Sequence, residues 1–298
     1  MAPTALARTA ASEFRSNGWK RCRTRRCVST ARRRRSGSRA MRLTVLGGSA
    51  ASPNTGAGCS GYLIQHGTTA VALDLGPGTL QELRRHTDFR TLAAVVISHL
   101  HPDHTLDVFA LQFSLAYNPR PAPLPVPVWL PPGGPELLAR LTAAYGDLGE
   151  APGFFSSRLQ PQVYDPAVPL AIGSLTLEFA AGVHYIPSWA MRVSAAGRSI
   201  GYTGDTGPSA PLDRFFAGVD LLLAEATLLD APPGSEATRG SLTAAEAGAL
   251  ATRSSAKRLL LTHLWEERGF ASALAAARST YGGPIDLARP GLRVSLRA

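Results

Sequence analysis

Cysteine is scarce in this chain of 298 residues, and its shortage narrows the chemistry. There are three cysteines, Cys22, Cys27 and Cys59, and two of them lie within the first forty residues. With a single cysteine in the remainder, the sequence offers neither a disulfide framework nor a CxxC metal knuckle. This usage fits a reducing compartment, so the predicted location is the cytoplasm.

Long hydrophobic runs are missing as well. No stretch of 18 or more apolar residues occurs, so the sequence predicts no membrane span. The start of the chain also lacks the apolar core of a secretory signal. A hydrophobic content of 45% nevertheless supports a buried core, and the length suits one large domain or two small ones.

Acidic residues are almost absent from residues 1–40, which hold twelve Lys or Arg and only one acid, Glu13. This segment carries +11, and subtracting it from the net charge of +10 leaves −1 for residues 41–298. We expect residues 1–40 to be a disordered Arg-rich extension or the product of a mis-called start, because "MRLTVLGG" at Met41 opens like a first strand. A transit peptide and a nucleic-acid-binding arm are the alternatives.

Residues 41–298 alternate between strand-like and helix-like patterns, which predicts one domain. Eight prolines between residues 119 and 135 leave room for at most an edge strand near "VPVWL". Two packed sheets with helices on their outer faces, an α/β (α+β) fold, are the simplest solution. The predicted strands are 42–48, 60–67, 69–78, 92–100, 173–182, 190–197, 198–205, 218–226, 257–264 and 291–296, and the predicted helices 79–86, 104–118, 135–146, 241–254 and 266–281.

Histidine is also rare, yet three of the seven histidines fall within "SHLHPDH", residues 98–104. The motif follows a buried strand, and His99 and His101, two apart in extended chain, point to the same side. Pro102 then turns the chain, so that Asp103 and His104 can address a second point nearby. Imidazole and carboxylate ligands suit Zn²⁺, and also Fe and Mn.

Three further candidates end apolar strands elsewhere. His184 follows "LTLEFAAGV", Asp205 lies in the Gly-rich turn of "GYTGDTG", and His263 ends "LLLTHL". Five of the seven histidines therefore end strands that could meet at one edge of the sandwich. His66 and His86 lack this context and are predicted to be surface residues.

The sequence resembles the metallo-β-lactamase fold hydrolases, whose HxHxDH signature matches residues 99–104. The opening "LGGSAASPNTGAGCSGYLI" resembles the small bacterial phosphodiesterase branch, which is related to ribonuclease Z. The resemblance covers essentially all of residues 41–298 and implies a four-layer αβ/βα sandwich. It further implies two divalent metal ions, most simply Zn²⁺ and alternatively Mn²⁺ or Fe²⁺. One would be held by His99, His101 and His184, the other by Asp103, His104 and His263, with Asp205 bridging both.

Such a pair can share a water and lower its pKa, yielding a bridging hydroxide that attacks an anionic diester. Asp103 and Asp205 are the catalytic candidates. Secreted β-lactamases are disfavoured, since those of the common di-zinc type have cysteine where Asp205 stands. Glyoxalase II-type enzymes carry a C-terminal helical domain, for which only about 35 residues remain after His263. A non-enzymatic binding module is opposed by the complete ligand set.

The tRNA 3′-end nucleases are the main rival. They carry a protruding arm between the ligands matching His184 and Asp205, where this chain has only a short hairpin. Their His-Glu-Ala-Thr segment corresponds to "AEAT", with Ala224 replacing the histidine. The segment "HYIPSWAMRV" instead resembles small enzymes that hydrolyse cyclic nucleotides such as 3′,5′-cyclic AMP.

A small phosphodiester is therefore the predicted substrate, and hydrolysis through the metal-bridging hydroxide the predicted reaction. Nucleic acid is a partner only in the alternative that uses the basic tail, no membrane is expected, and a homodimer is expected by analogy. The remaining site candidates orient a metal-bound histidine or lie near the substrate; they are Glu225, Arg192, Ser188 and Ser60, with Asn54 on the same N-terminal loop.

Overall fold

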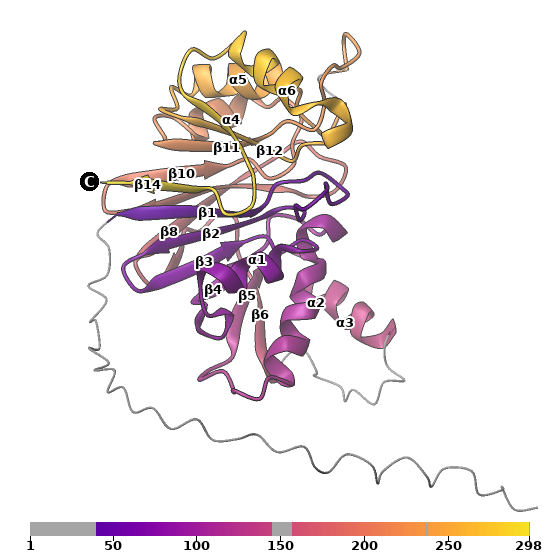
Figure 1. The fold of residues 1–298 in the computed structure, drawn as a ribbon, viewed down its shortest axis with the longest axis vertical. Coiled ribbons are helices and arrows are strands. Elements are labelled where there is room, and N and C mark those ends of the chain that lie inside the picture. Colours follow the sequence, from indigo (N-terminus) through magenta and orange to yellow (C-terminus); the bar gives the residue numbers. More distant parts are fainter. Residues whose placement is uncertain (1–39, 145–156, 236–237, 298) are drawn as a thin grey trace, which may run out of the picture. The chain divides into compact units, whose positions relative to one another are not determined.

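Two β-sheets pack face to face, and helices cover the outer face of each sheet (Figure 1). The computed structural model describes residues 40–144, 157–235 and 238–297, so the expectations for residues 1–39 fall outside the described residues. Within them the arrangement is the four-layer αβ/βα sandwich expected from the sequence, and the predicted fold class is confirmed.

The first sheet is built from the N-terminal half and one C-terminal strand, in the order β14-β1-β2-β3-β4-β5-β6. Helices α1 (Thr79–His86), α2 (Pro102–Ala116) and α3 (Gly134–Ala144) lie on its outer side (Figure 1). Its strands are β1 (Met41–Gly47), β2 (Gly61–His66), β3 (Thr69–Leu73), β4 (Ala94–Val96), β5 (Val126–Leu130), β6 (Leu159–Val163) and β14 (Arg293–Leu296), and a short 3₁₀ turn covers Phe89–Thr91.

The second sheet follows the order β13-β12-β11-β10-β9-β8-β7. Helices α4 (Ala210–Phe215), α5 (Ala244–Arg253) and α6 (Phe270–Arg278) cover it from the other side (Figure 1). Its strands are β7 (Leu170–Ile172), β8 (Leu175–Ala181), β9 (Trp189–Ala195), β10 (Arg198–Tyr202), β11 (Leu221–Glu225), β12 (Leu259–Thr262) and β13 (Ile285–Leu287), and a 3₁₀ turn spans Glu266–Arg268.

The apolar runs in the sequence arise because central strands are buried on both faces. Along β11, Leu221 and Leu223 belong to the core between the two sheets, whereas Leu222 and Ala224 pack toward the helices. Strand β2 alternates in the same way, with Tyr62 and its neighbours at every second position facing the inter-sheet core. A strand with two buried faces has no polar alternation, which explains the unbroken hydrophobic stretches.

The expectation that "VPVWL" forms at most an edge strand is wrong. Strand β5 lies between β4 and β6 and pairs in parallel with both. The proline is tolerated because the amide positions of Val126 and of Pro127 point to opposite neighbours. Val126 donates to Arg158 beside β6, whereas the pairing with β4 begins only at Val128. The missing N–H of Pro127 therefore costs no hydrogen bond in either ladder.

The sequence patterns did not predict four short elements, namely α4, β6, β7 and β13. Strand β13 is three residues long and β6 contains a proline, so neither carries a period long enough to recognise. The hairpin predicted around Gly197 is present, and the positive φ of 73° at this glycine closes the turn from β9 to β10.

Parallel pairing brings several strand ends to one edge of the sandwich. Strands β3 and β4 are parallel in the first sheet, and β10, β11 and β12 are parallel in the second. Residues just beyond the carboxyl ends of such strands share one edge. The strand-terminal candidates predicted from the sequence are placed there by this topology.

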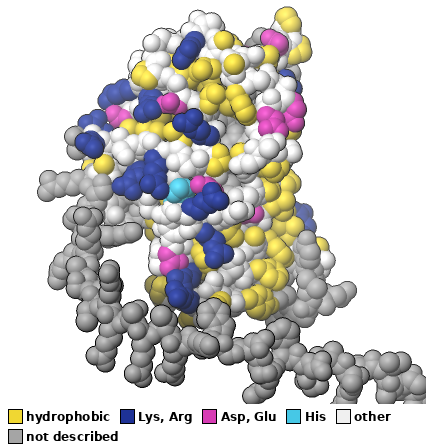
Figure 2. Space-filling view, viewed as in Figure 1, with side chains coloured by type: hydrophobic (Ala, Val, Ile, Leu, Met, Phe, Trp, Pro, Cys, Tyr) yellow, Lys and Arg dark blue, Asp and Glu magenta, His cyan; other side chains and the backbone are white. Residues whose placement is uncertain are grey.

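The surface of the described part carries mixed charge. Figure 2 shows Lys and Arg side chains interspersed with Asp and Glu on the face in view. Among the described residues, no helix combines the length and apolarity needed to cross a bilayer.

Helix α5 begins with a reciprocal capping box. Thr243 Oγ1 accepts a hydrogen bond from the Glu246 amide at 3.2 Å, and Glu246 Oε2 accepts one from the Thr243 amide at 2.8 Å. We expect Thr243→Ala to lower the free energy of unfolding by about 1 kcal/mol, measured by urea denaturation. Thr243→Ser keeps the hydroxyl and should stay close to wild type; equal loss in both variants would contradict the capping role.

Candidate metal centre

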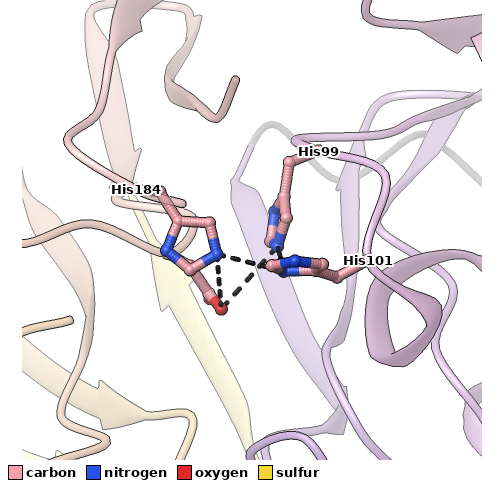
Figure 3. Close-up of side chains that lie close together, drawn as sticks. His99, His101 and His184 are labelled. Atoms are coloured by element: carbon pink, nitrogen blue, oxygen red, sulfur yellow. Dashed lines mark hydrogen bonds and ion pairs between the residues drawn. The ribbon is translucent and has the colours of Figure 1, made fainter. Parts of the chain in front are cut away.

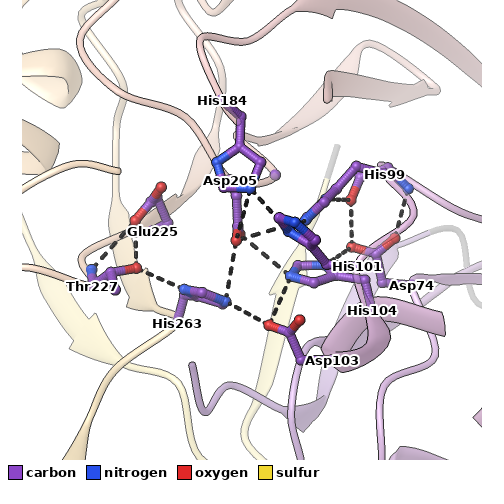
Figure 4. A network of polar contacts seen from close by, with 12 residues as sticks. Asp74, His99, His101, Asp103, His104, His184, Asp205, Glu225, Thr227 and His263 are labelled. Atoms are coloured by element: carbon purple, nitrogen blue, oxygen red, sulfur yellow. Dashed lines mark hydrogen bonds and ion pairs between the residues drawn. The ribbon is translucent and has the colours of Figure 1, made fainter. Parts of the chain in front are cut away.

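Seven side chains converge at the shared strand edge in two groups that have Asp205 in common (Figures 3 and 4). Within each group, one nitrogen or oxygen from every residue lies within 4.8 Å of the others. The members of the first are His99, His101, His184 and Asp205, and those of the second Asp103, His104, Asp205 and His263. The structure thus brings together all seven residues selected from the sequence.

The first group has three imidazole nitrogens facing one another (Figure 3). His101 Nδ1 lies 3.2 Å from His99 Nε2 and 3.0 Å from His184 Nε2. Asp205 Oδ2 lies 3.7 Å from His99 Nε2 and 3.9 Å from His184 Nε2. Donors held about 2.1 Å from a tetrahedral Zn²⁺ lie about 3.4 Å from one another, so these separations suit one ion.

The second group is equally compact and more deeply buried. His263 Nε2 lies 3.1 Å from Asp103 Oδ2 and 3.3 Å from Asp205 Oδ2. His104 Nε2 lies 3.4 Å from Asp103 Oδ2 and 3.3 Å from Asp205 Oδ1. Both carboxylates therefore face both imidazoles, which is a donor set for a divalent cation.

Hydrogen bonds outside the groups fix which ring nitrogen faces inward. His184 Nδ1 donates to the carbonyl oxygen of Gly240 at 2.6 Å, and His104 Nδ1 donates to Asp74 Oδ2 at 2.7 Å. In each neutral ring the proton then sits on Nδ1, and the lone pair of Nε2 points into the site.

Asp74 is the main residue that the sequence analysis missed. It is fully buried and also accepts hydrogen bonds from the Ser98 amide at 2.6 Å, the Ser98 hydroxyl at 2.7 Å and the Tyr202 hydroxyl at 2.6 Å. These bonds aim its carboxylate at His104. Asp74 directly follows the apolar strand β3. Asp205 was selected because it follows an apolar strand, and the same criterion would have selected Asp74.

Thr227 links Glu225 to the site. The Thr227 hydroxyl donates to Glu225 Oε2 at 2.6 Å, and the Thr227 hydroxyl oxygen accepts from His263 Nδ1 at 2.6 Å (Figure 4). Glu225 also accepts from the Thr206 amide at 2.7 Å. Burial, and next the Asp205 carboxylate, raise the pKa of Glu225 to about 8. Glu225 therefore reaches His263 only through Thr227.

The electrostatics of the second group show how strongly it favours positive charge. Burial alone would lower the pKa of His104 and His263, but the surrounding acidic side chains, Asp205 foremost, together outweigh it and raise both. Burial alone would raise the pKa of Asp103 and Asp205, but interactions with His104 and His263 outweigh it and lower both. A divalent cation offers the same charge as these protons and would release them on binding.

Two buried atoms in the second group support this fit. His104 Nε2 and Asp205 Oδ1 face each other at 3.3 Å, yet neither has a hydrogen-bond partner among the described residues. A buried polar atom without a partner costs about 1–3 kcal/mol. A metal ion between the two would satisfy both, so the residues fit the cation that the donor set implies.

Backbone geometry brings these side chains close. A Cβ at Gly76 would lie 1.8 Å from the carbonyl oxygen of Asp103, so only glycine allows the start of α2 to approach so closely. Asp74 and His263 both adopt a positive φ, 54° and 57°. Such conformations are uncommon for residues other than glycine and tend to gather at functional sites.

The remaining candidates are not hydrogen bonded to the two groups. Arg192 donates to the carbonyl oxygens of Phe215 and Ala217 at the end of α4, so its guanidinium is held there rather than at the site. Ser60 and Ser188 are buried, and their hydroxyls lack hydrogen-bond partners among the described residues.

Three further residues named from the sequence also bond elsewhere. Asn54 ties its loop to Leu264 and Glu266. His66 pairs with Ser174, and His86 pairs with Glu82 and is half-buried rather than fully at the surface.

Known proteins with a similar sequence include named metal-dependent hydrolases. A family model described as a beta-lactamase superfamily domain matches residues 69–264. A probable metallo-hydrolase of Bacillus subtilis, YhfI, is 27% identical, over 84% of this chain and 98% of its own. An uncharacterized protein of Mycobacterium tuberculosis is 31% identical over 82% of this chain and 88% of its own. Ribonuclease Z of Myxococcus xanthus is 27% identical over 86% and 98%.

Solved structures share the fold. The crystal structure of YhfI from Bacillus subtilis superposes with a TM-score of 0.75 at 26% identity, covering 85% of this chain and 99% of that one. The human short-form tRNase Z superposes with a TM-score of 0.66 at 22% identity, covering 87% and 100%.

The Thr227 contact predicts a specific loss of metal. In Thr227→Val the Nδ1–H of His263 loses its acceptor, so we expect metal affinity to fall about 10–100-fold, measured by competition with a chromophoric chelator. Thr227→Ser should restore the affinity, and both variants should keep the wild-type circular dichroism spectrum. A valine variant that binds metal as tightly as wild type would show that the hydroxyl does not orient His263.

Proposed function

Because the chain belongs to the beta-lactamase superfamily and is a metal-dependent hydrolase, we propose that it hydrolyses small phosphodiesters, above all cyclic nucleotides such as 3′,5′-cyclic AMP. We propose that the site holds two divalent metal ions. Zn²⁺ is the preferred ion, and Mn²⁺ and Fe²⁺ are alternatives that suit the same ligands.

The ligand assignment follows the two donor groups. His99, His101 and His184 would hold one ion, Asp103, His104 and His263 the other, and Asp205 would contact both. Bound there, the two ions would lower the pKa of a shared water and screen the negative charge of the diester.

The protein's own groups supply orientation. Gly240, Asp74 and Thr227 hold three of the imidazoles with Nε2 facing inward. Asp103 turns Oδ2 toward His104 and His263, and its other oxygen would accept a hydrogen bond that orients the metal-bound water. Glu225 does not contact the imidazole directly; it accepts a hydrogen bond from the Thr227 hydroxyl and so orients the group that holds His263.

The short connection between His184 and Asp205 is the main support for a small substrate. Between His184 and Asp205 the chain forms only the β9–β10 hairpin, which turns directly at Ala196 and Gly197. This is the position at which tRNA 3′-end nucleases, in the resemblance described above, carry their protruding arm. Without an arm, a long RNA lacks that contact surface, whereas a small diester needs none.

The position of Ala224 supports the same choice. It stands where those nucleases have a histidine, and its methyl group is fully buried in the core beneath the helices. Ala224 has no proton to give a leaving group.

Nuclease activity is the second candidate, because sequence relatives of similar identity are named ribonuclease Z. The basic residues 1–39 would serve a nucleic-acid partner in that case, but they lie outside the described residues. The cytoplasmic location, the homodimer and the single domain over residues 41–298 stay predictions.

A panel of substrates tests the proposal. We expect the metal-loaded full-length chain to hydrolyse 3′,5′-cyclic AMP and bis-p-nitrophenyl phosphate, and to leave pre-tRNA largely intact, when product formation is measured in parallel. Efficient cleavage of pre-tRNA with both small diesters untouched would reverse the ranking of the two candidates.

Asp205 gives the sharpest single-residue test. Because its carboxylate faces both groups, we expect Asp205→Ala to lose most of the bound metal and to reduce turnover by at least 100-fold. Metal content and rate on cyclic AMP are the two measurements. Asp165→Ala, which alters an exposed turn, is the matched control and should behave as wild type. Retention of both metals and of full turnover in Asp205→Ala would remove the shared-ligand assignment.

A further inference from the structure

Tyr185 directly follows the candidate ligand His184, and its side chain is 69% exposed. Tyrosine is intermediate in burial among the residue types, and here none of the cores described above includes this ring. Its ring centroid lies 5.1 Å from that of His184 at an angle of 52°. The exposed ring therefore contacts one member of the first donor group directly.

The backbone beneath Tyr185 is held in place. Two residues earlier, the Val183 amide donates to Thr206 Oγ1 at 2.9 Å, and the Val183 carbonyl accepts from the Gly207 amide at 2.6 Å. The Gly182 amide donates to the carbonyl oxygen of Ser188 at 2.9 Å, closing the loop across its base. Tyr185 thus projects from a braced loop, and only its two side-chain torsions need to be ordered on binding.

Gly240 fixes the ring from behind. A Cβ at this glycine would lie 2.9 Å from His184 Nδ1 and 2.9 Å and 3.0 Å from Cε2 and Cδ2 of Tyr185. The same backbone segment accepts the hydrogen bond from His184. Only glycine leaves room for both side chains at this point, so His184 and Tyr185 lie against the same stretch of backbone.

We propose that Tyr185 is the platform on which the nucleobase of the substrate stacks while the phosphodiester lies at the donor groups. This inference rests on the proposed function and names the part of the substrate that the site recognises. An aromatic ring is neutral and offers a π face, so it suits a base rather than a phosphate. The sugar would lie over the His184 ring, which contacts Tyr185 and belongs to the first donor group.

Paired substrates test this assignment. We compare 3′,5′-cyclic AMP with a ribose 3′,5′-cyclic phosphate that has no base, using the metal-loaded full-length chain. For Tyr185→Ala we expect KM for cyclic AMP to rise about tenfold with a smaller change in kcat, and no change for the baseless diester. Tyr185→Phe keeps the ring and should keep the wild-type KM.

The matched control is Tyr117→Ala. Tyr117 is similarly exposed, at 64%, and lies at the far end of α2, about 20 Å along the helix from Asp103. This variant should leave KM for both substrates unchanged. An equal loss on both substrates in Tyr185→Ala would overturn the platform, because a stacking role cannot affect a substrate without a base.

A binding measurement separates this inference from the proposed function. By calorimetry, wild type should bind AMP about tenfold more tightly than ribose 5-phosphate, and Tyr185→Ala should abolish that difference. If wild type cleaves neither diester but shows this difference, the function is wrong and the base platform stands. If wild type cleaves both diesters equally well and binds both monophosphates equally, the function stands and the platform is wrong.

Discussion

A buried carboxylate in contact with both halves of the molecule is the constraint on which the site depends. Asp205 follows β10 of the second sheet, yet its oxygens lie within 4 Å of His99 and His104, which follow β4 of the first sheet. A charge buried in this way must be balanced, since removing it from water is costly. The two sheets therefore enclose a point that demands positive charge.

The surroundings of the donor groups explain how that point becomes a rigid site. The Asp74 carboxylate, the Gly240 carbonyl and the Thr227 hydroxyl each accept the outer proton of one imidazole. Asp74 and Thr227 lie just beyond strands β3 and β11, and Gly240 lies in the connection from β11 to α5. Because these acceptors hold the outer nitrogens, the inner nitrogens are aimed before any ligand arrives. Preorganisation of this kind lets a metal-dependent hydrolase act without rearranging its ligands.

The proposed contact with the base uses the same fixed turn as the metal ligand. The braced turn that carries His184 also presents Tyr185, and one glycine supports both. The short β9–β10 hairpin, in place of an arm, is the feature that favours the proposed compact substrate. In the proposed mode of binding, the donor groups would recognise the phosphodiester and the aromatic ring beside them the base.

The sequence by itself determined the layers of the fold and the side chains that meet. Apolar strands ending in His or Asp are a local signal, and parallel strands bring their ends to one edge, so all seven donors could be named in advance. It did not determine the interior position of β5, because the effect of Pro127 depends on how far β4 extends beside it. It also placed Arg192 near the substrate, whereas the carbonyl groups at the end of α4 hold its guanidinium.

Only the tertiary structure decided which nitrogen of each histidine faces the site. The atoms responsible lie far away in the chain, 56 residues in the case of His184 and Gly240, and 30 in the case of His104 and Asp74. No local pattern encodes such a pairing, since a hydrogen bond depends on distance and direction in space. Residue type sets which atoms can bind, and folding sets where those atoms point.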